Sequence, residues 1–171
     1  RLLDTGRRIE RTMHMSRLIK ELAVDGDPAA EGGLDLLLEL GDSSMTYRTR
    51  YLSSVQLTPV IDLLLCDDSN PRSVAFQISA LSEHVDHLPH DRELAMLSRM
   101  QYLIESMRSE LRLIDVKSLC LLQNKRGKRK HLEKLLESTE TRTFALSDAL
   151  AQRYFAHATA TRSQASGGVS P

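Results

Sequence analysis

The 171-residue chain carries 23 Lys plus Arg and 23 Asp plus Glu, so no net charge draws it to nucleic acid or to acidic membranes. It is 41% hydrophobic and 27% charged, with no Trp, which is typical of a soluble globular domain. No apolar run approaches the ~20 residues that a membrane span needs, and no signal-peptide pattern is present. We therefore expect one domain over residues 1–160, and neither nucleic acid nor membrane as a partner.

Apolar residues recur at helical spacing along the chain, and no segment alternates as a strand does. The sharpest stripe, in the segment 91–114, has the 3-4-3-4-3 spacing of antiparallel bundle packing. The fold class predicted is all-α, an antiparallel helical bundle of about five to seven helices. The helices expected are 1–24, 29–40, 45–54, 58–65, 71–88, 91–114 (with a continuation towards 123) and 131–158, followed by a disordered tail over 161–171.

Breaks between these helices follow from Gly, Pro and small polar residues. Gly41 is expected to cap the second helix at its C-terminus, and Thr58-Pro59 to start the helix of residues 60–65. Gly6 lies within the first helix, where glycine costs about 1 kcal/mol relative to alanine. We therefore expect Gly6 to mark a close approach between two helices.

The segment Asn70-Pro71-Arg72-Ser73 is the most specific local pattern. Asn70 is expected to cap a helix whose first residue is Pro71. Arg72 would then carry a positive charge in the first turn, which the helix dipole disfavours, so it needs an acidic partner. The candidates are Asp62, Asp67, Asp68 and Glu10. A structural Arg–carboxylate clamp is the first interpretation, and a functional site is the alternative.

Two further segments contribute candidate binding residues. Arg7, Glu10 and Arg11 lie on the first helix, where such residues usually form a solvated charged face. Tyr47 and Tyr51 share one face of the third helix and are expected at the edge of the core, with their hydroxyls in water. If both segments converged on the Arg72 turn, they would form a pocket suited to a carboxylate or a phosphate.

Other clusters carry less specific chemistry. The segment Glu83–Asp91 contains His84 and His87 at a spacing that could share a face, but a metal site wants more convergent ligands, so neither a metal nor a cofactor is predicted. The basic segment 125–131 is interpreted as a solvated loop, with phosphate contact as the alternative. Cys66 and Cys120 are expected to be buried free thiols in a reducing cytoplasm. No catalytic motif is present.

Four sequence motifs resemble those of the bacterial alpha-E domain family. The helix Gly6-Arg7-x-Ile9-Glu10-Arg11 is similar to the family's G-R-x-[LIV]-E-R, and Asp67-x-x-Asn70-Pro71-Arg72-Ser73-Val74 to its D-x-x-N-P-R-S-[VL]. Met45–Arg48 and Leu146–Phe155 resemble segments of members fused to a circularly permuted ATP-grasp module. The resemblance covers residues 2–158. Where the family often has R-E-N-A-R, this chain has no arginine between Leu81 and Asp86.

The resemblance implies the C-terminal half of a longer protein, because longer members carry the G-R-x-x-E-R helix twice. It also implies a partner, an ATP-grasp-type peptide or amide ligase, fused or separate, with a peptide or amino acid as a further candidate ligand. The function expected is a non-catalytic accessory or interaction module with a polar cluster of Arg7, Glu10, Arg11, Tyr47, Asn70 and Arg72. The alternatives are an enzyme module that contributes this cluster to peptide-bond formation or hydrolysis, and a purely structural scaffold.

Overall fold

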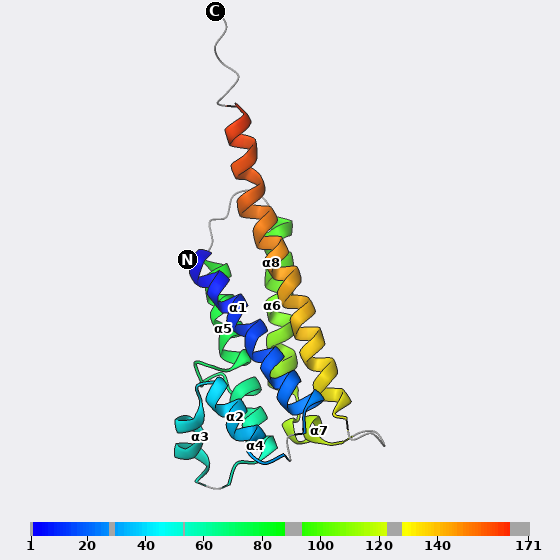
Figure 1. Ribbon diagram of the computed structural model, residues 1–171. Helices are drawn as coiled ribbons and strands as arrows, with labels where there is room; N and C mark the ends of the chain where they lie inside the picture. Colours follow the sequence, from blue (N-terminus) through cyan, green and yellow to red (C-terminus); the bar gives the residue numbers. More distant parts are fainter. Residues whose placement is uncertain (1, 28–29, 53, 88–93, 123–127, 165–171) are drawn as a thin grey trace, which may run out of the picture.

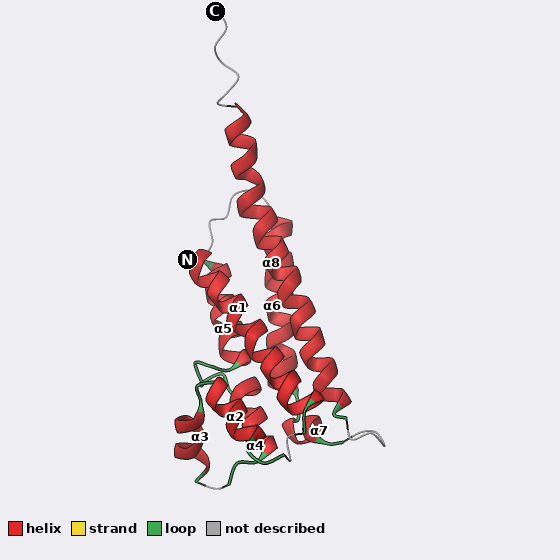
Figure 2. Ribbon diagram, viewed as in Figure 1, coloured by secondary structure: helices red, strands yellow, loops and turns green. Residues whose placement is uncertain are grey.

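The computed structural model describes residues 2–27, 30–52, 54–87, 94–122 and 128–164, with residues 94–98 and 155–164 described by their backbone alone. Within these ranges the chain forms helices and no strand, which confirms the all-α prediction (Figure 2). The eight α-helices are one more than the five to seven expected. They are α1 (Leu2–Ile19), α2 (Gly33–Leu40), α3 (Ser44–Tyr51), α4 (Leu57–Ile61), α5 (Val74–Asp86), α6 (Leu94–Leu113), α7 (Val116–Cys120) and α8 (Lys130–Gln164).

Four long helices, α1, α5, α6 and α8, run alternately down and up and form the bundle (Figure 1). Each contacts the next, and α8 closes the ring by packing against α1. The short helices α2, α3 and α4 lie together at the lower end in this view, next to α7. The upper end, where α1 begins, therefore carries only long helices.

The predicted apolar stripes form the core. Val74, Ile78, Leu81 and Val85 of α5 are fully buried. The α6 stripe is buried at Met100, Ile104, Met107 and Leu111, and the α8 stripe at Leu132, Leu136, Thr139, Leu146 and Leu150. The short helix of residues 60–65 is buried at every position except Asp62, as its nearly uniform apolar character predicts.

Two α-helices end in a π-helical turn. α1 continues as η1 (Lys20–Asp25), and α4 continues as η2 (Asp62–Cys66). Each closes with a backbone hydrogen bond across five residues, from the N–H of Gly26 to the carbonyl of Glu21 (2.8 Å) and from the N–H of Asp67 to the carbonyl of Asp62 (2.9 Å). The wider turn at η2 leads directly into the Asn70 segment.

The end of α2 shows why Gly41 is a glycine, and it corrects the expectation for Gly6. Gly41 is the C-cap, as predicted, and the N–H groups of Asp42 and Ser43 bond back to the carbonyls of Glu39 and Leu38, both at 2.9 Å, which is a Schellman motif. A Cβ on Gly41 would lie 3.1 Å from Leu64 Cδ2 and 3.3 Å from Met15 Cε. The close approach expected at Gly6 is found at Gly41 instead, because around Gly6 no described atom other than its chain neighbours and the adjacent turns of its own helix backbone lies within 4 Å of where a Cβ would be.

Several helix boundaries differ from the prediction. α5 begins at Val74 instead of Pro71, and its cap is Ser73, whose Oγ accepts the Phe76 N–H at 3.0 Å. Turns occupy the four residues before it, because the Asn70 side chain bonds to Leu63 and Ser43 and does not cap a helix. α2 starts at Gly33, after a turn in which Gly32 has a φ of +79°.

The far end of the chain also differs. α7 follows a break after Leu113, where Asp115 Oδ1 accepts the Lys117 N–H at 3.2 Å and starts a separate helix. α8 continues to Gln164, beyond the end expected at about 158, so residues 161–164 are helical. Residues 165–171 of the expected tail lie outside the described residues.

Candidate functional site

Glu10 and Arg11 lie on the exposed surface of α1. Among the residues that the structure describes, neither side chain makes a hydrogen bond or an ion pair. Arg7, one turn earlier, is also exposed and approaches only the carboxylate of Asp4, at 3.6 Å on the same helix. A charged pair that ties helices together would be partnered across them, so these three residues do not hold the bundle together.

Within the segment Arg7–Arg11, the arginine that connects α1 to another described helix is Arg8, which the sequence analysis did not single out. Its Nη1 donates to Gln77 Oε1 of α5 at 3.0 Å, and its guanidinium carbon lies 5.5 Å from the centre of the Phe76 ring. Gln77, which is 1% exposed, donates in turn from Nε2 to the carbonyl of Pro71 at 2.6 Å. The helical phase turns Arg8 toward α5 and leaves Arg7 and Arg11 facing outward.

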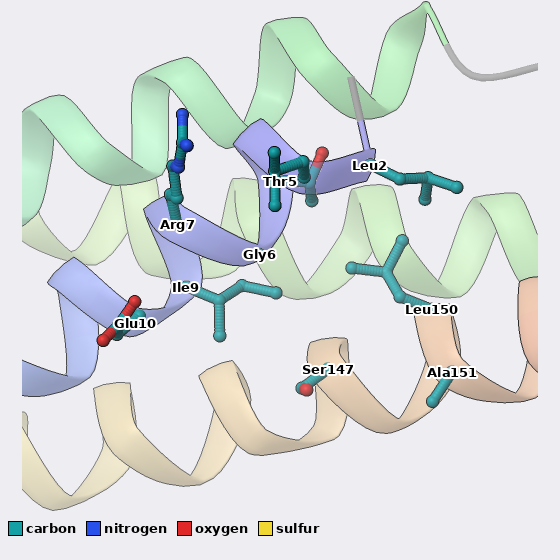
Figure 3. A pocket seen from close by; sticks show the side chains of 10 residues that line it. Leu2, Thr5, Gly6, Arg7, Ile9, Glu10, Ser147, Leu150 and Ala151 are labelled. Atoms are coloured by element: carbon teal, nitrogen blue, oxygen red, sulfur yellow. The ribbon is translucent and has the colours of Figure 1, made fainter.

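A groove of about 520 Å³ lies between the first turns of α1 and the later part of α8. Its lining is mostly apolar, and its residues are Leu2, Leu3, Thr5, Gly6, Arg7, Ile9 and Glu10 of α1 with Ser147, Leu150 and Ala151 of α8. Figure 3 shows Ile9, Ser147 and Leu150 between the two helices, while Arg7 projects from α1 away from α8. Glu10 therefore lies at the edge of an apolar surface.

The lower part of the same helix pair is closed. Arg17 Nε donates to Glu140 at 2.8 Å, and Lys20 Nζ donates to Glu137 at 2.9 Å. Ile19 and Leu136 fill the core beneath these pairs. The opening is thus confined to the end of the bundle where α1 begins, and Leu3, which is 68% exposed, stands in it without a hydrophobic cover.

Tyr47 does not line this groove. Its side chain is fully buried, and its hydroxyl donates to the carbonyl of Ser54 at 3.3 Å and accepts the Gln56 N–H at 3.1 Å. The expectation of a hydroxyl in water is therefore wrong for Tyr47. The shared face with Tyr51 is confirmed, since the ring centres lie 4.9 Å apart. Tyr47 fixes the loop after α3.

Asn70 is 2% exposed and organises the turn that bears its motif. Its Nδ2 donates to the carbonyl of Leu63 at 2.9 Å and to Ser43 Oγ at 3.3 Å, while its Oδ1 accepts the N–H of Arg72 at 3.2 Å. The expected cap role is wrong, because the side chain points back into the fold and not along α5. It joins the first turn of η2 to Ser43, the N-cap of α3.

Arg72 has an acidic partner, as its place in the chain predicted, but none of the four candidates. It pairs with Asp42, which has a left-handed φ of 47° after the end of α2, and both side chains remain largely exposed. Asp67, one of the candidates, pairs with Arg50 of α3 instead. Sequence spacing could not indicate this exchange, because Asp42 reaches the turn only through the fold.

Among the carboxylates in the described part of the chain, Asp67 is the one with a lowered pKa. Burial alone raises the pKa of Asp67, but hydrogen bonds from Ser69 Oγ at 2.7 Å, from the Ser69 N–H at 2.9 Å and from Arg50 outweigh it. The net pKa lies below the ordinary carboxylate value. Ser69 belongs to the turn itself and Arg50 to the neighbouring helix α3, which assigns Asp67 to the folded structure around the turn.

The remaining clusters hold no site within the described residues. No group of three or more His, Cys, Asp or Glu in the described part of the chain is arranged to hold a metal ion, and residues 88–91 of the histidine cluster lie outside it. At the basic segment, of which 125–127 are not described, Arg129 donates to the carbonyls of Cys120 (3.1 Å) and Ala23 (3.2 Å). Burial raises the pKa of Cys66 to about 12 and also raises that of Cys120, which removes both as nucleophiles.

The structure therefore separates the six candidate residues. Arg7 and Glu10 line the groove, Arg11 is exposed next to Glu10, and Tyr47, Asn70 and Arg72 belong to the folded loops around α3 and α5. Sequence reasoning missed Leu2, Leu3, Ser147 and Ala151 of the groove. The consecutive leucines at the start of α1 were a usable signal, because only one of them fits an inward stripe.

The fold and the exposed Glu-Arg pair define a helical bundle domain in which the described residues contain no catalytic constellation. The chain belongs to the Alpha-E family, described as "a predicted alpha-helical domain with a conserved ER motif", which matches residues 1–155. The dipeptide Glu-Arg occurs once in the sequence, at Glu10-Arg11. In this chain, the dipeptide that the description mentions is therefore present only as the exposed pair beside the groove.

Similar proteins include uncharacterized proteins of Mycobacterium bovis and of two strains of Mycobacterium tuberculosis, each 31% identical over 113 residues. The match covers 65% of this chain and 12% of each relative, so the chain spans a small part of their length. No solved structure matches the chain. Of the helices in the described ranges, none is both long and apolar enough to cross a membrane.

Proposed function

We propose that this chain is a non-catalytic interaction module of an ATP-grasp-type peptide or amide ligase system. Its docking face is the surface of α1 that carries Glu10 and Arg11, together with the groove between α1 and α8. The bacterial ATP-grasp partner comes from the family resemblance, and since such ligases use intracellular ATP, the proposal places the chain in the cytoplasm.

One observation carries the proposal: the Glu-Arg pair, the dipeptide that the family description mentions, makes no hydrogen bond or ion pair in the described fold. Both side chains are exposed and have no described partner, and they stand beside an apolar groove. Protein interfaces combine an apolar centre with a polar rim. A charged pair at the rim sets orientation and partner choice more than raw affinity.

The enzyme alternative has less support. The described lining offers two charged side chains and the hydroxyls of Thr5 and Ser147, and it contains no His or Cys. Acid–base or nucleophilic catalysis requires a base within hydrogen-bond reach of the reacting group, and no described residue makes a hydrogen bond to Glu10 that would orient it. The scaffold alternative fits Arg8, Asn70 and Tyr47, but not the Glu-Arg pair.

The test is a binding titration between this chain and the ATP-grasp ligase from the same organism, by calorimetry, with and without ATP and Mg²⁺. Reversal of the motif charges, Glu10→Lys with Arg11→Glu, is expected to weaken binding at least about tenfold, as the loss of interface contacts worth ~1.4 kcal/mol or more does. The matched control reverses Glu39 and Arg48, which are exposed on α2 and α3 at the other end of the molecule.

The control variant is expected to bind like wild type. If wild type and both variants bind equally, the Glu-Arg pair is not the docking face. If the ligase does not bind wild type at all, with or without ATP, the proposed partner is wrong. A peptide or amino-acid ligand would instead give a thermal shift with the small ligand alone, which this proposal does not expect.

A further inference from the structure

Gly6 is the least expected residue in the groove. It lies in the interior of α1 and is exposed, and apart from its chain neighbours and the local helix backbone no described atom lies within 4 Å of where its Cβ would be. A helix-interior glycine costs about 1 kcal/mol relative to alanine. No turn or positive φ at this position and no close contact in the described structure needs a glycine. The missing side chain leaves bare helix backbone in the α1 wall of the groove.

We infer that the groove takes a single amphipathic helix of the ligase partner, packed across Gly6 with apolar side chains inside the groove and a Lys or Arg facing Glu10. This inference rests on the proposed function and adds the secondary structure and chemistry of the docked segment.

The shape of the groove favours a helix. Helix axes pack 8–10 Å apart, at a distance that depends on the side chains at the contact. Gly6 on one wall and Ser147 and Ala151, one turn apart on the other, are small enough for a third helix to lie close to both α1 and α8. Leu2, Leu3 and Leu150 supply the apolar surface for its anchor side chains. The described chain has no strand, so it offers no sheet edge that an extended peptide could extend.

The distribution of polarity argues against a small-molecule ligand. Small-molecule sites place several convergent polar groups inside a concave pocket. Here the interior is apolar, and Figure 3 shows Arg7 projecting away from α8. The exposed carboxylate of Glu10, with no described partner, is left for a cation at the edge, which charge complementarity assigns to a Lys or Arg on the docked helix.

The first experiment fills the groove without disturbing the fold. Gly6→Leu adds a side chain where no described atom lies within 4 Å, so we expect the melting temperature to stay at or above that of wild type. Binding of the ligase is expected to fall at least about tenfold, because the added side chain occupies the place of the partner's anchor. Leu36→Phe on α2, also an enlargement of an exposed position, is the control and should bind like wild type.

The second experiment identifies the docked segment. A benzophenone amino acid replaces Leu3, with Leu113 of α6 as the control position, and the cross-linked ligase peptide is mapped by mass spectrometry. The expected product from position 3 is a segment with apolar residues three or four apart and a Lys or Arg on the same face. Reversing that cation to Glu in the ligase should restore binding to the Glu10→Lys variant.

The outcomes separate the two proposals. If Glu10→Lys with Arg11→Glu weakens binding but Gly6→Leu does not, the docking face stands and the helix in the groove is overturned. Cross-links to a strand, to a loop or to a second copy of this chain also overturn it. If wild type does not bind the ligase, the proposed function fails and the inference fails with it.

Discussion

Gly6 of α1 and Gly41 at the end of α2 are expected to respond to the same substitution in opposite directions. Gly6→Ala places a Cβ in open space on an exposed helix and should raise the free energy of unfolding by roughly 0.5–1 kcal/mol. Gly41→Ala places a Cβ 3.0 Å from the carbonyl oxygen of Leu37 and 3.1 Å from Leu64 Cδ2, which is tighter than ordinary contact. Overpacking of this kind costs about 1–3 kcal/mol.

The assay is thermal and urea unfolding, followed by the circular dichroism signal of the helices at about 222 nm. For a chain of this length, 1 kcal/mol shifts the melting temperature by about 2–4 °C. Gly6→Ala should therefore melt up to about 4 °C higher than wild type, and Gly41→Ala several degrees lower. A lower melting temperature for Gly6→Ala would mean that another part of the chain covers Gly6, and it would refute the open groove.

Three further predictions concern the loops around α3 and α5. Asn70→Ala removes the hydrogen-bond donor to the buried Leu63 carbonyl and should lower the free energy of unfolding by about 1–3 kcal/mol. Arg72→Ala removes an exposed ion pair and should lower it by at most about 1 kcal/mol. Equal losses of unfolding free energy in urea would contradict this order. Burial raises the folded-state pKa of Asp67, but hydrogen bonds from Ser69 and Arg50 outweigh it and lower the pKa. The charged form of Asp67 therefore stabilises the fold at pH values above the ordinary carboxylate pKa. This stabilisation is lost as the pH falls through the lower, folded-state pKa. Asp67→Asn should therefore show a weaker decline of melting temperature between about pH 6 and about pH 3 than wild type, and an identical decline would refute the assignment. With a pKa of about 12, Cys66 in a Cys120→Ser variant should react with a thiol reagent at about pH 8 at least about a hundredfold more slowly in the native protein than in urea.

The sequence predicted the core better than the turns. The periodic stripes of α5, α6 and α8 are buried as expected, because a helix with one apolar face has only one way to remove that face from water. The start of α5 was misplaced because Asn70-Pro71 is an equally good signal for a turn. What decides between them is the buried carbonyl of Leu63, which takes the Asn70 amide, and sequence spacing does not reveal that contact.

The site was predicted in part, for a similar reason. Arg7, Glu10 and Arg11 were correctly placed on an exposed helical face, where their spacing puts them. Which neighbouring arginine would face α5 depends on the helical phase, and a run of Arg7-Arg8 followed by Glu10-Arg11 leaves that phase open. The groove depends on how far α1 and α8 separate at one end, and this is set by packing between segments more than 130 residues apart.

The most direct measurement is the affinity of the ATP-grasp ligase for wild type, for the Glu10→Lys, Arg11→Glu variant and for Gly6→Leu, measured in one calorimetric series with the Glu39→Lys, Arg48→Glu control. The account predicts tight binding of wild type and control, and at least about tenfold weaker binding of both groove variants at unchanged or higher melting temperatures. Equal affinity of all four proteins, or no binding by wild type, would contradict the claim that this face of α1 is where the partner docks.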